Sequence, residues 1–159
     1  MSQDRFATLR SLLQRSSSLA EWEHLIQFIE QWPDAGQQQL AVDYAGMHLN
    51  TWDDRHRIAE QVDPDLPWWP LVRHINLRSA NTNESLAALE STKDVLSQIT
   101  CLTLGGLSRY RQVTKALSDR SGLMELKYLD LERRAISGTE LKQLMRAPAL
   151  HSLEEWHLN

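Results

Sequence analysis

Histidine and carboxylate side chains could bind a metal ion or act in acid–base catalysis. The segment from His48 to His56 contains two histidines together with Asp53 and Asp54. Two metal-binding histidines on one helix face lie about four residues apart, whereas these two are eight residues apart. Helix capping and surface charge explain the sequence WDDRHR more simply, so no metal site is predicted.

Cys101 is the only cysteine, so no intrachain disulfide can form, and a reducing compartment, the cytoplasm, is expected. A nucleophilic cysteine needs an activating neighbour and a pocket, and the one candidate base is His74. The sequence has no phosphate-binding loop, dinucleotide fingerprint or serine elbow. We therefore predict a protein without catalytic activity or cofactor. The alternative is a metal-binding or cysteine-dependent enzyme accessory protein.

Composition narrows the class of protein further. The chain has 159 residues, of which 42% are hydrophobic and 24% charged, which is typical of a folded globular protein. The net charge of -4 comes without a basic stripe, which argues against nucleic acid or an anionic membrane as partner. No apolar run approaches the roughly 18 residues that would cross a bilayer.

The elements that would position these residues follow an internal repeat. Four segments start 27 residues apart: VRHINL at Val72, ITCLTL at Ile99, LKYLDL at Leu126 and LEEWHL at Leu153. Their first, fourth and sixth positions form three apolar columns: Val72, Ile99, Leu126 and Leu153; Ile75, Leu102, Leu129 and Trp156; and Leu77, Leu104, Leu131 and Leu158. A fourth column precedes the segments: Trp69, Leu96, Leu123 and Leu150. Such agreement indicates a repeated structural unit.

The pattern L-x-x-L-x-L at this period resembles the leucine-rich repeat, in particular the ribonuclease-inhibitor-like type, from Pro70 to Asn159. The resemblance implies an α/β solenoid in which strand–helix repeats form a parallel sheet over a shared core. The family usually has Asn or Cys after the strand, where this chain has Ala80, Leu107 and Arg134. Gly105 and Gly106 predict a local distortion in the second repeat.

Helices are predicted between the strands, because apolar residues recur there at helical spacing. These residues are Leu86, Leu89 and Leu96; Val113, Ala116, Leu117 and Leu123; and Leu141, Leu144 and Met145. Ser137 with Glu140 predicts a capping box, and Asn81 with Glu84 a similar start. Pro148 predicts the end of the third helix.

The segment before the repeats is predicted to be helical. Helices are expected over residues 3–14, after Ser18, after Asp34 and over residues 53–61, the middle two started by side-chain caps. The second is expected to bury Trp22, Leu25, Ile26, Phe28 and Ile29, and the third carries Leu40, Ala41, Tyr44, Met47 and His48. Three prolines exclude a regular helix over residues 63–70. We therefore predict an α-helical N-terminal cap over residues 1–66 and leucine-rich repeats over 67–159; a partner-binding module is the alternative to the cap.

Candidate binding residues come from alternation along the strands, which points the residues between the apolar columns to the concave, water-exposed face. Three rows result: His74, Cys101, Tyr128 and Glu155; Asn76, Thr103, Asp130 and His157; and Arg78, Gly105, Glu132 and Asn159. The face is acidic toward its C-terminal end, which suits a protein partner with a basic patch. The competing interpretation is that exposed strand faces are polar by default.

Two features leave alternatives open. Trp68 and Trp69 lie between prolines. At least one of them, with Trp69 favoured, is expected to fill the seam between the helices and the repeats. An exposed recognition patch is the other interpretation.

The fourth strand comes at the end of the sequence. Its edge is expected either to pair with a partner or a second copy or to tuck against the third repeat. By analogy with the family, we expect a protein–protein interaction module, an adaptor or scaffold.

Overall fold

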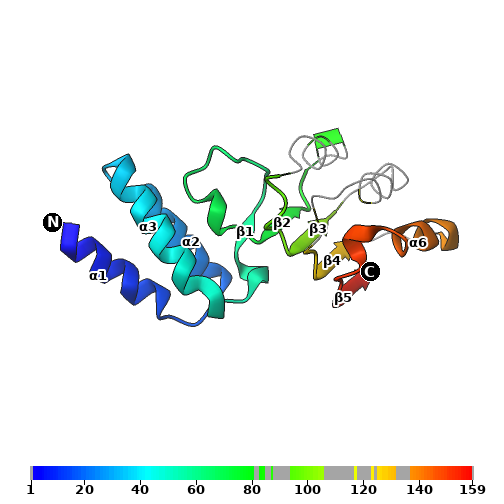
Figure 1. Cartoon of the computed structure of the whole chain (residues 1–159), viewed down its shortest axis with the longest axis horizontal. Coiled ribbons are helices and arrows are strands. Elements are labelled where there is room, and N and C mark those ends of the chain that lie inside the picture. Colours follow the sequence, from blue (N-terminus) through cyan, green and yellow to red (C-terminus); the bar gives the residue numbers. More distant parts are fainter. Residues whose placement is uncertain are drawn as a thin grey trace. The chain divides into compact units, whose positions relative to one another are not determined.

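The computed structural model describes residues 2–80, 83–84, 87, 94–105, 117, 123, 125–131 and 137–158 (Figure 1). The chain forms two compact units. The first contains Met1–Ile58 and Asp63–Val72, and the second contains Ala59–Val62 and Arg73–Asn159. The predicted domain division between residues 66 and 67 stays a prediction. In the described part, no helix is both long and apolar enough to cross a membrane.

The first unit is built from three α-helices that lie side by side (Figure 1): α1 (Ser2–Leu13), α2 (Leu19–Glu30) and α3 (Ala35–His48). Both expected capping residues start their helices. Ser18 Oγ accepts a hydrogen bond from the backbone N–H of Glu21 at 3.2 Å, and Asp34 Oδ1 accepts one from Gln37 at 2.8 Å. These bonds satisfy backbone donors that the first helical turn leaves unpaired. The three predicted helices are therefore confirmed.

The third helix buries a different face from the one that its large apolar residues suggested. Leu40 is 60% exposed and Met47 67% exposed. Ala41, which belongs to the predicted set, is buried, and so are Val42 and Ala45, which do not belong to it. Alanine side chains let neighbouring helices approach closely, so the close packing in this unit selects the small residues for the inner face.

The predicted helix over residues 53–61 is wrong. That segment forms a single 3₁₀ turn, η2 (Asp54–His56), followed by the two-residue strand β1 (Ile58–Ala59). A tertiary hydrogen bond competes with helix propagation: Arg57 is buried, and its Nε donates to the carbonyl of Leu71 at 2.9 Å. Nearby lie two more 3₁₀ turns, η1 (Leu49–Thr51) and η3 (Trp69–Leu71).

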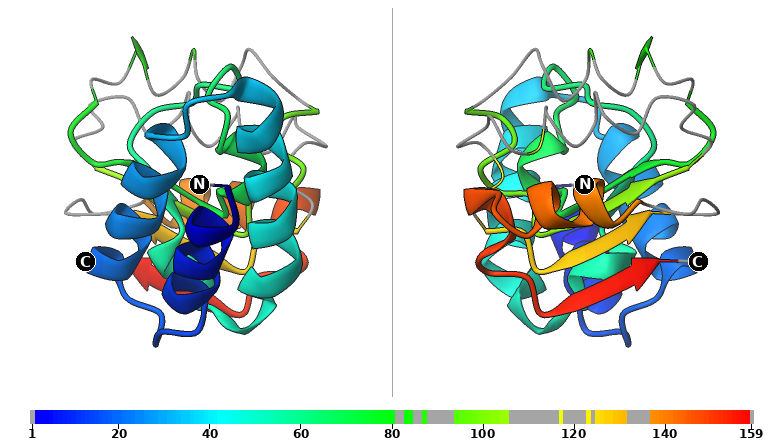
Figure 2. Two further views of the ribbon diagram at one scale, coloured as in Figure 1. Left: turned by 90° about the vertical axis from the view of Figure 1, so that its left-hand side faces the viewer. Right: turned by 90° about the vertical axis from the view of Figure 1, so that its right-hand side faces the viewer.

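The second unit contains four parallel strands, β2 (His74–Leu77), β3 (Cys101–Leu104), β4 (Tyr128–Leu131) and β5 (Glu155–Leu158). The sheet order is β1-β2-β3-β4-β5, and the right-hand view in Figure 2 shows the later strands side by side. Each residue pairs with the residue 27 positions later, as His74 does with Cys101 and Cys101 with Tyr128. The chain is therefore an α/β protein with a five-stranded sheet.

The backbone enters each of these strands in the same way. A one-turn hydrogen bond precedes every strand, from Val72 N to Trp69 O, Ile99 N to Leu96 O, Leu126 N to Leu123 O and Leu153 N to Leu150 O. One carbonyl then accepts two N–H groups of the next strand: Arg73 from Thr100 and Cys101, Thr100 from Lys127 and Tyr128, and Lys127 from Glu154 and Glu155. The turns join the fourth apolar column to the first, so the repeat in the sequence is also a repeat in backbone geometry.

The apolar columns form the core of this unit. Ile75, Leu102 and Leu129 are fully buried in adjacent strands. Trp156, the last member of their column, is half-buried. Stacking of equivalent residues removes apolar surface that a single strand would leave in water.

Helix α6 (Gly138–Leu144) lies before β5 and is followed by the 3₁₀ turn η5 (Pro148–Leu150). This confirms the third predicted repeat helix, although Met145 is 65% exposed and does not belong to its buried face. Leu86, Leu89, Val113 and Ala116, on which the other two predicted helices rest, lie outside the described residues, as do Asn81 and Gly106.

Candidate functional site

The strands bring the predicted binding residues into two rows. The register aligns His74, Cys101, Tyr128 and Glu155 in one row and Asn76, Thr103, Asp130 and His157 in the next. Glu132 and Asn159 lie outside the described residues. We call the two rows, with Arg78 and Gly105 at the ends of β2 and β3, the strand-face cluster.

The prediction that this whole face is exposed to water is wrong. His74, Cys101, Thr103 and Asp130 are buried. Asn76, Tyr128 and His157 are half-buried, and Arg78 and Glu155 are exposed. Adjacent parallel strands lie about 4.8 Å apart, so large side chains in neighbouring strands cover the small ones between them.

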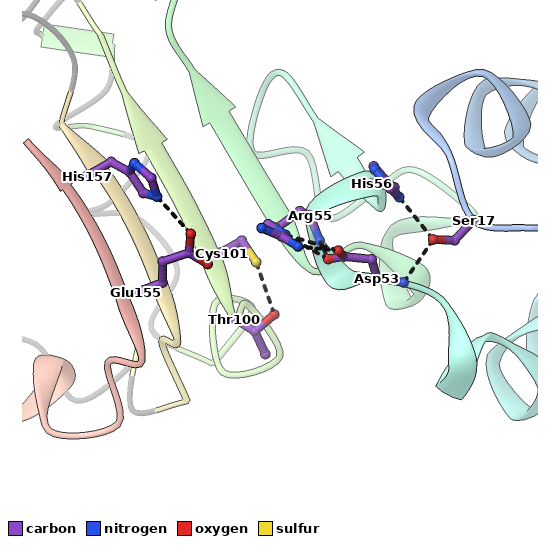
Figure 3. A network of polar contacts seen from close by, with 8 residues as sticks. All are labelled: Ser17, Asp53, Arg55, His56, Thr100, Cys101, Glu155 and His157. Atoms are coloured by element: carbon purple, nitrogen blue, oxygen red, sulfur yellow. Dashed lines mark hydrogen bonds and ion pairs between the residues drawn. The ribbon is translucent and has the colours of Figure 1, made fainter. Parts of the chain in front are cut away.

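Aromatic rings form a run along this face. The Tyr128 ring centroid lies 6.2 Å from that of His74 and 5.4 Å from that of His157. Each histidine also has a polar partner. His74 Nε2 lies 2.9 Å from Thr103 Oγ1. His157 Nε2 lies 2.8 Å from Glu155 Oε1, as Figure 3 shows. These contacts hold Tyr128 between two fixed rings.

An ion pair crosses the cluster from β2 to β4. Arg78, just after β2, places Nη2 3.4 Å from Oδ2 of Asp130. Between them lies the end of β3, where the next residue, Gly105, has no side chain. A Cβ atom on Gly105 would lie 2.9 Å from both Cα and O of Arg78 and 3.0 Å from its Cγ. The glycine therefore leaves room for the backbone and the first part of the side chain of Arg78. The local distortion predicted at this position stays a prediction.

Asp130 is only partly satisfied by this pair. The residue is 7% exposed. Among the described residues, no hydrogen-bond donor reaches its second carboxylate oxygen, Oδ1, which is also buried. Buried polar atoms are nearly always hydrogen-bonded, so such an atom calls for an explanation. Sequence reasoning placed Asp130 on this face but gave no sign that it would be buried, because burial depends on neighbours two strands away.

Cys101 is a buried member of the first row. Its Sγ lies 3.7 Å from Thr100 Oγ1 (Figure 3). The candidate base His74 is its neighbour in register and directs Nε2 to Thr103.

The two histidines of the segment from His48 to His56 lie on different elements and have different partners. His48 is exposed on α3, where its ring lies 4.3 Å from that of Tyr44. His56 Nδ1 lies 3.0 Å from Ser17 Oγ, which also accepts a hydrogen bond from Asp53 N at 3.2 Å (Figure 3). Sequence reasoning missed Ser17, because it lies 39 residues before His56. The bonds connect the α1–α2 turn to η2.

Asp53 forms a short ion pair in this segment, since Arg55 Nη2 lies 2.7 Å from its Oδ2. Hydrogen bonds from the Arg55 guanidinium lower the pKa of Asp53, against an opposing effect of burial. No three His, Cys, Asp or Glu residues in the described ranges are grouped closely enough to hold a metal ion.

The paired tryptophans differ in their surroundings. Trp69 is buried, and Trp68 is half-buried with Nε1 donating to Glu30 Oε1 at 2.8 Å. The Trp68 ring also packs edge-to-face against Trp22, 6.2 Å between centroids. Trp69 is therefore buried, as its place in the fourth apolar column suggested, and its role in a seam between helices and repeats stays a prediction.

Comparisons with known proteins give no match: the chain matches no family model, no curated protein and no solved structure. The arrangement of its own residues is therefore the basis of any functional conclusion.

The close approach at Gly105 predicts a steric cost. We expect Gly105→Ala to destabilise the protein by about 1–3 kcal/mol, because the new methyl group meets backbone atoms that cannot rotate away. Gly138→Ala is the matched control, since no atom lies within 4 Å of its added Cβ, and it should leave stability unchanged or raise it. Urea denaturation measures both. Equal stabilities of the two variants would contradict the close approach.

The Asp53–Arg55 pair predicts a pH dependence. Because the folded-state pKa of Asp53 is lowered, the pair stabilises the protein above the unfolded-state pKa of about 3.9. That stability is lost as the pH falls through the folded-state pKa. Asp53→Asn should cost at most about 1 kcal/mol at pH 7, since the pair is partly exposed, and progressively less in acid.

Urea denaturation between pH 3 and pH 7 tests this expectation. Asp65→Asn is the control, since Asp65 is exposed and has no arginine partner among the described residues. A stability difference between Asp53→Asn and wild type that grows toward low pH would have the wrong sign for this ion pair.

Proposed function

We propose that residues 67–159 form a leucine-rich-repeat solenoid of the ribonuclease-inhibitor-like type, preceded by a helical cap over residues 1–66. Two observations support this proposal. Parallel strands pair with a constant offset of 27 residues, and the same turn precedes each of them. A unit that cannot bury its own apolar face gains a core by stacking on an equivalent unit.

We further propose that the protein is a non-catalytic protein–protein interaction module, an adaptor or complex subunit of the cytoplasm, that binds its partner through the strand-face cluster. The observation that carries this proposal is the run of rings along the strand face, formed by His74, Tyr128 and His157, with charged groups beside it. Tyrosine is enriched at interface hot spots, because its ring gives a large contact area at little cost in conformational entropy. Here two neighbouring rings already hold it in place.

The charges beside Tyr128 indicate the character of the partner. Asp130 lies on β4, the strand that contains Tyr128, and Glu155 lies opposite Tyr128 on the neighbouring strand β5. Two carboxylates in this position favour a basic patch on the bound protein. The edge strand β5 offers a second way to bind. Its backbone groups can accept an added strand from a partner or from a second copy.

Duplication of one repeat tests the solenoid. A variant with a second copy of residues 99–125 inserted after residue 125 should still fold cooperatively, because a solenoid accepts an extra unit that contacts only its neighbours. We expect stability at or above that of wild type in urea denaturation and more strand signal in circular dichroism. Insertion of a shuffled sequence of the same composition is the control. Loss of folding in both variants would contradict the solenoid.

Tyr128→Ala tests the interaction face. In quantitative affinity capture from cells that express the protein, a partner that binds this face should be recovered about thirtyfold less with Tyr128→Ala than with wild type, because truncating a hot spot costs about 2 kcal/mol. Tyr44→Ala is the matched control: Tyr44 is also half-buried but belongs to the first unit. Equal recovery of every captured protein by the two variants would contradict binding through the strand face.

A further inference from the structure

The half-satisfied carboxylate of Asp130 is the feature of the strand-face cluster that most needs an explanation. In the register, Asp130 stands between Thr103 on β3 and His157 on β5. Thr103 Oγ1 is engaged by His74, and His157 Nε2 by Glu155. Neither neighbour supplies a donor to Asp130 Oδ1, which is buried and has no hydrogen-bond partner within the part of the chain that the structure describes.

The group that contacts Asp130 is a guanidinium from the same chain, held in an incomplete way. Carboxylate and guanidinium groups pair best through two parallel hydrogen bonds of about 2.7–2.9 Å. The observed pair has one long contact of 3.4 Å to Oδ2, and the Arg78 side chain is 52% exposed. The contact that Arg78 gives up when it leaves Asp130 is therefore a weak one, since it is long and half of the arginine side chain is already in water.

The groups around Asp130 also suit a planar cation. Tyr128 lies two residues before it on β4, flanked by the rings of His74 and His157. Guanidinium groups stack favourably on aromatic faces. The exposed carboxylate of Glu155, opposite Tyr128 on β5, adds negative charge to this face, although it also contacts His157.

We infer that Asp130 is the anchor for an arginine side chain of the partner protein, and that Arg78 occupies the anchor in the unbound chain. The incoming guanidinium bonds to both carboxylate oxygens, including Oδ1, and its plane contacts Tyr128. Arginine fits better than lysine because a fork of donors matches two oxygens, whereas an ammonium is a point charge. This inference rests on the proposed function, since it names the chemistry by which the interaction face recognises its partner.

Nuclear magnetic resonance titration of the full chain with N-acetyl-L-arginine methylamide tests the anchor. The matched control ligand is the citrulline analogue, which has the same shape and no charge. We expect saturable shifts at Tyr128, Asp130 and His157 with the arginine compound, and affinity at least about tenfold weaker for citrulline, as expected for loss of a charge-assisted bond. Equal binding of the two compounds, or none of the arginine compound, would overturn the inference.

Two variants give opposite expected results. Asp130→Asn should weaken binding of the arginine compound about tenfold, with a melting temperature equal to or above that of wild type, because a half-satisfied carboxylate adds little to stability. Arg78→Gln should strengthen binding about threefold or more, since it removes the competing guanidinium and leaves Asp130 intact. Arg55→Gln, at the paired arginine of the first unit, should leave binding of the arginine compound unchanged.

The variants keep the test decisive. If Asp130→Asn fails to fold, the Arg78→Gln result alone decides, and unchanged or weaker binding by Arg78→Gln overturns the role of Arg78 as occupant. The proposed function is tested separately, by the Tyr128-dependent capture of a partner. A captured partner together with a silent arginine titration would retain the interaction module and remove the arginine anchor.

Discussion

The second unit depends on one constraint: each strand must pair in register with the strand 27 residues away, because its apolar side chains have no other place to be buried. Backbone hydrogen bonds fix this register, since the carbonyls of Arg73, Thr100 and Lys127 each accept two N–H groups at the start of the following strand. A slip of one residue would turn the buried leucines outward. The columns therefore determine which residues share a row, and thereby which polar groups meet on the opposite face.

Close strand pairing also explains why that face contains buried polar groups. Small residues such as Thr103 and Gly105 are covered by larger neighbours, and the polar atoms that become buried must find partners. His74 and Thr103 bond to each other, whereas one carboxylate oxygen of Asp130 has no partner among the residues that the structure describes. Exceptions to local consistency of this kind concentrate at functional sites, where an interaction with a ligand offsets the cost in stability.

The first unit obeys a different constraint. Three helices pack closely because alanines occupy the inner face of α3, and large side chains such as Leu40 and Met47 remain exposed. Aromatic contacts fill the spaces between the helices: Phe6 and Phe28 both pack edge-to-face against Trp32, with ring centroids 5.2 and 5.3 Å apart. Shape complementarity, more than the hydrophobicity of individual residues, decides which face is buried.

Periodicity and capping in the sequence by themselves determined the helices of the first unit, the four parallel strands and the register that aligns them, because these depend on local spacing and on residues that repeat. Only the tertiary structure decided the strand β1, the burial of Asp130 and the path of Arg78 over Gly105. The reason is physical. Whether a polar side chain is covered, and which donor reaches it, depends on atoms contributed by residues dozens of positions away, as in the 52-residue separation of Arg78 and Asp130, and no local pattern carries that information.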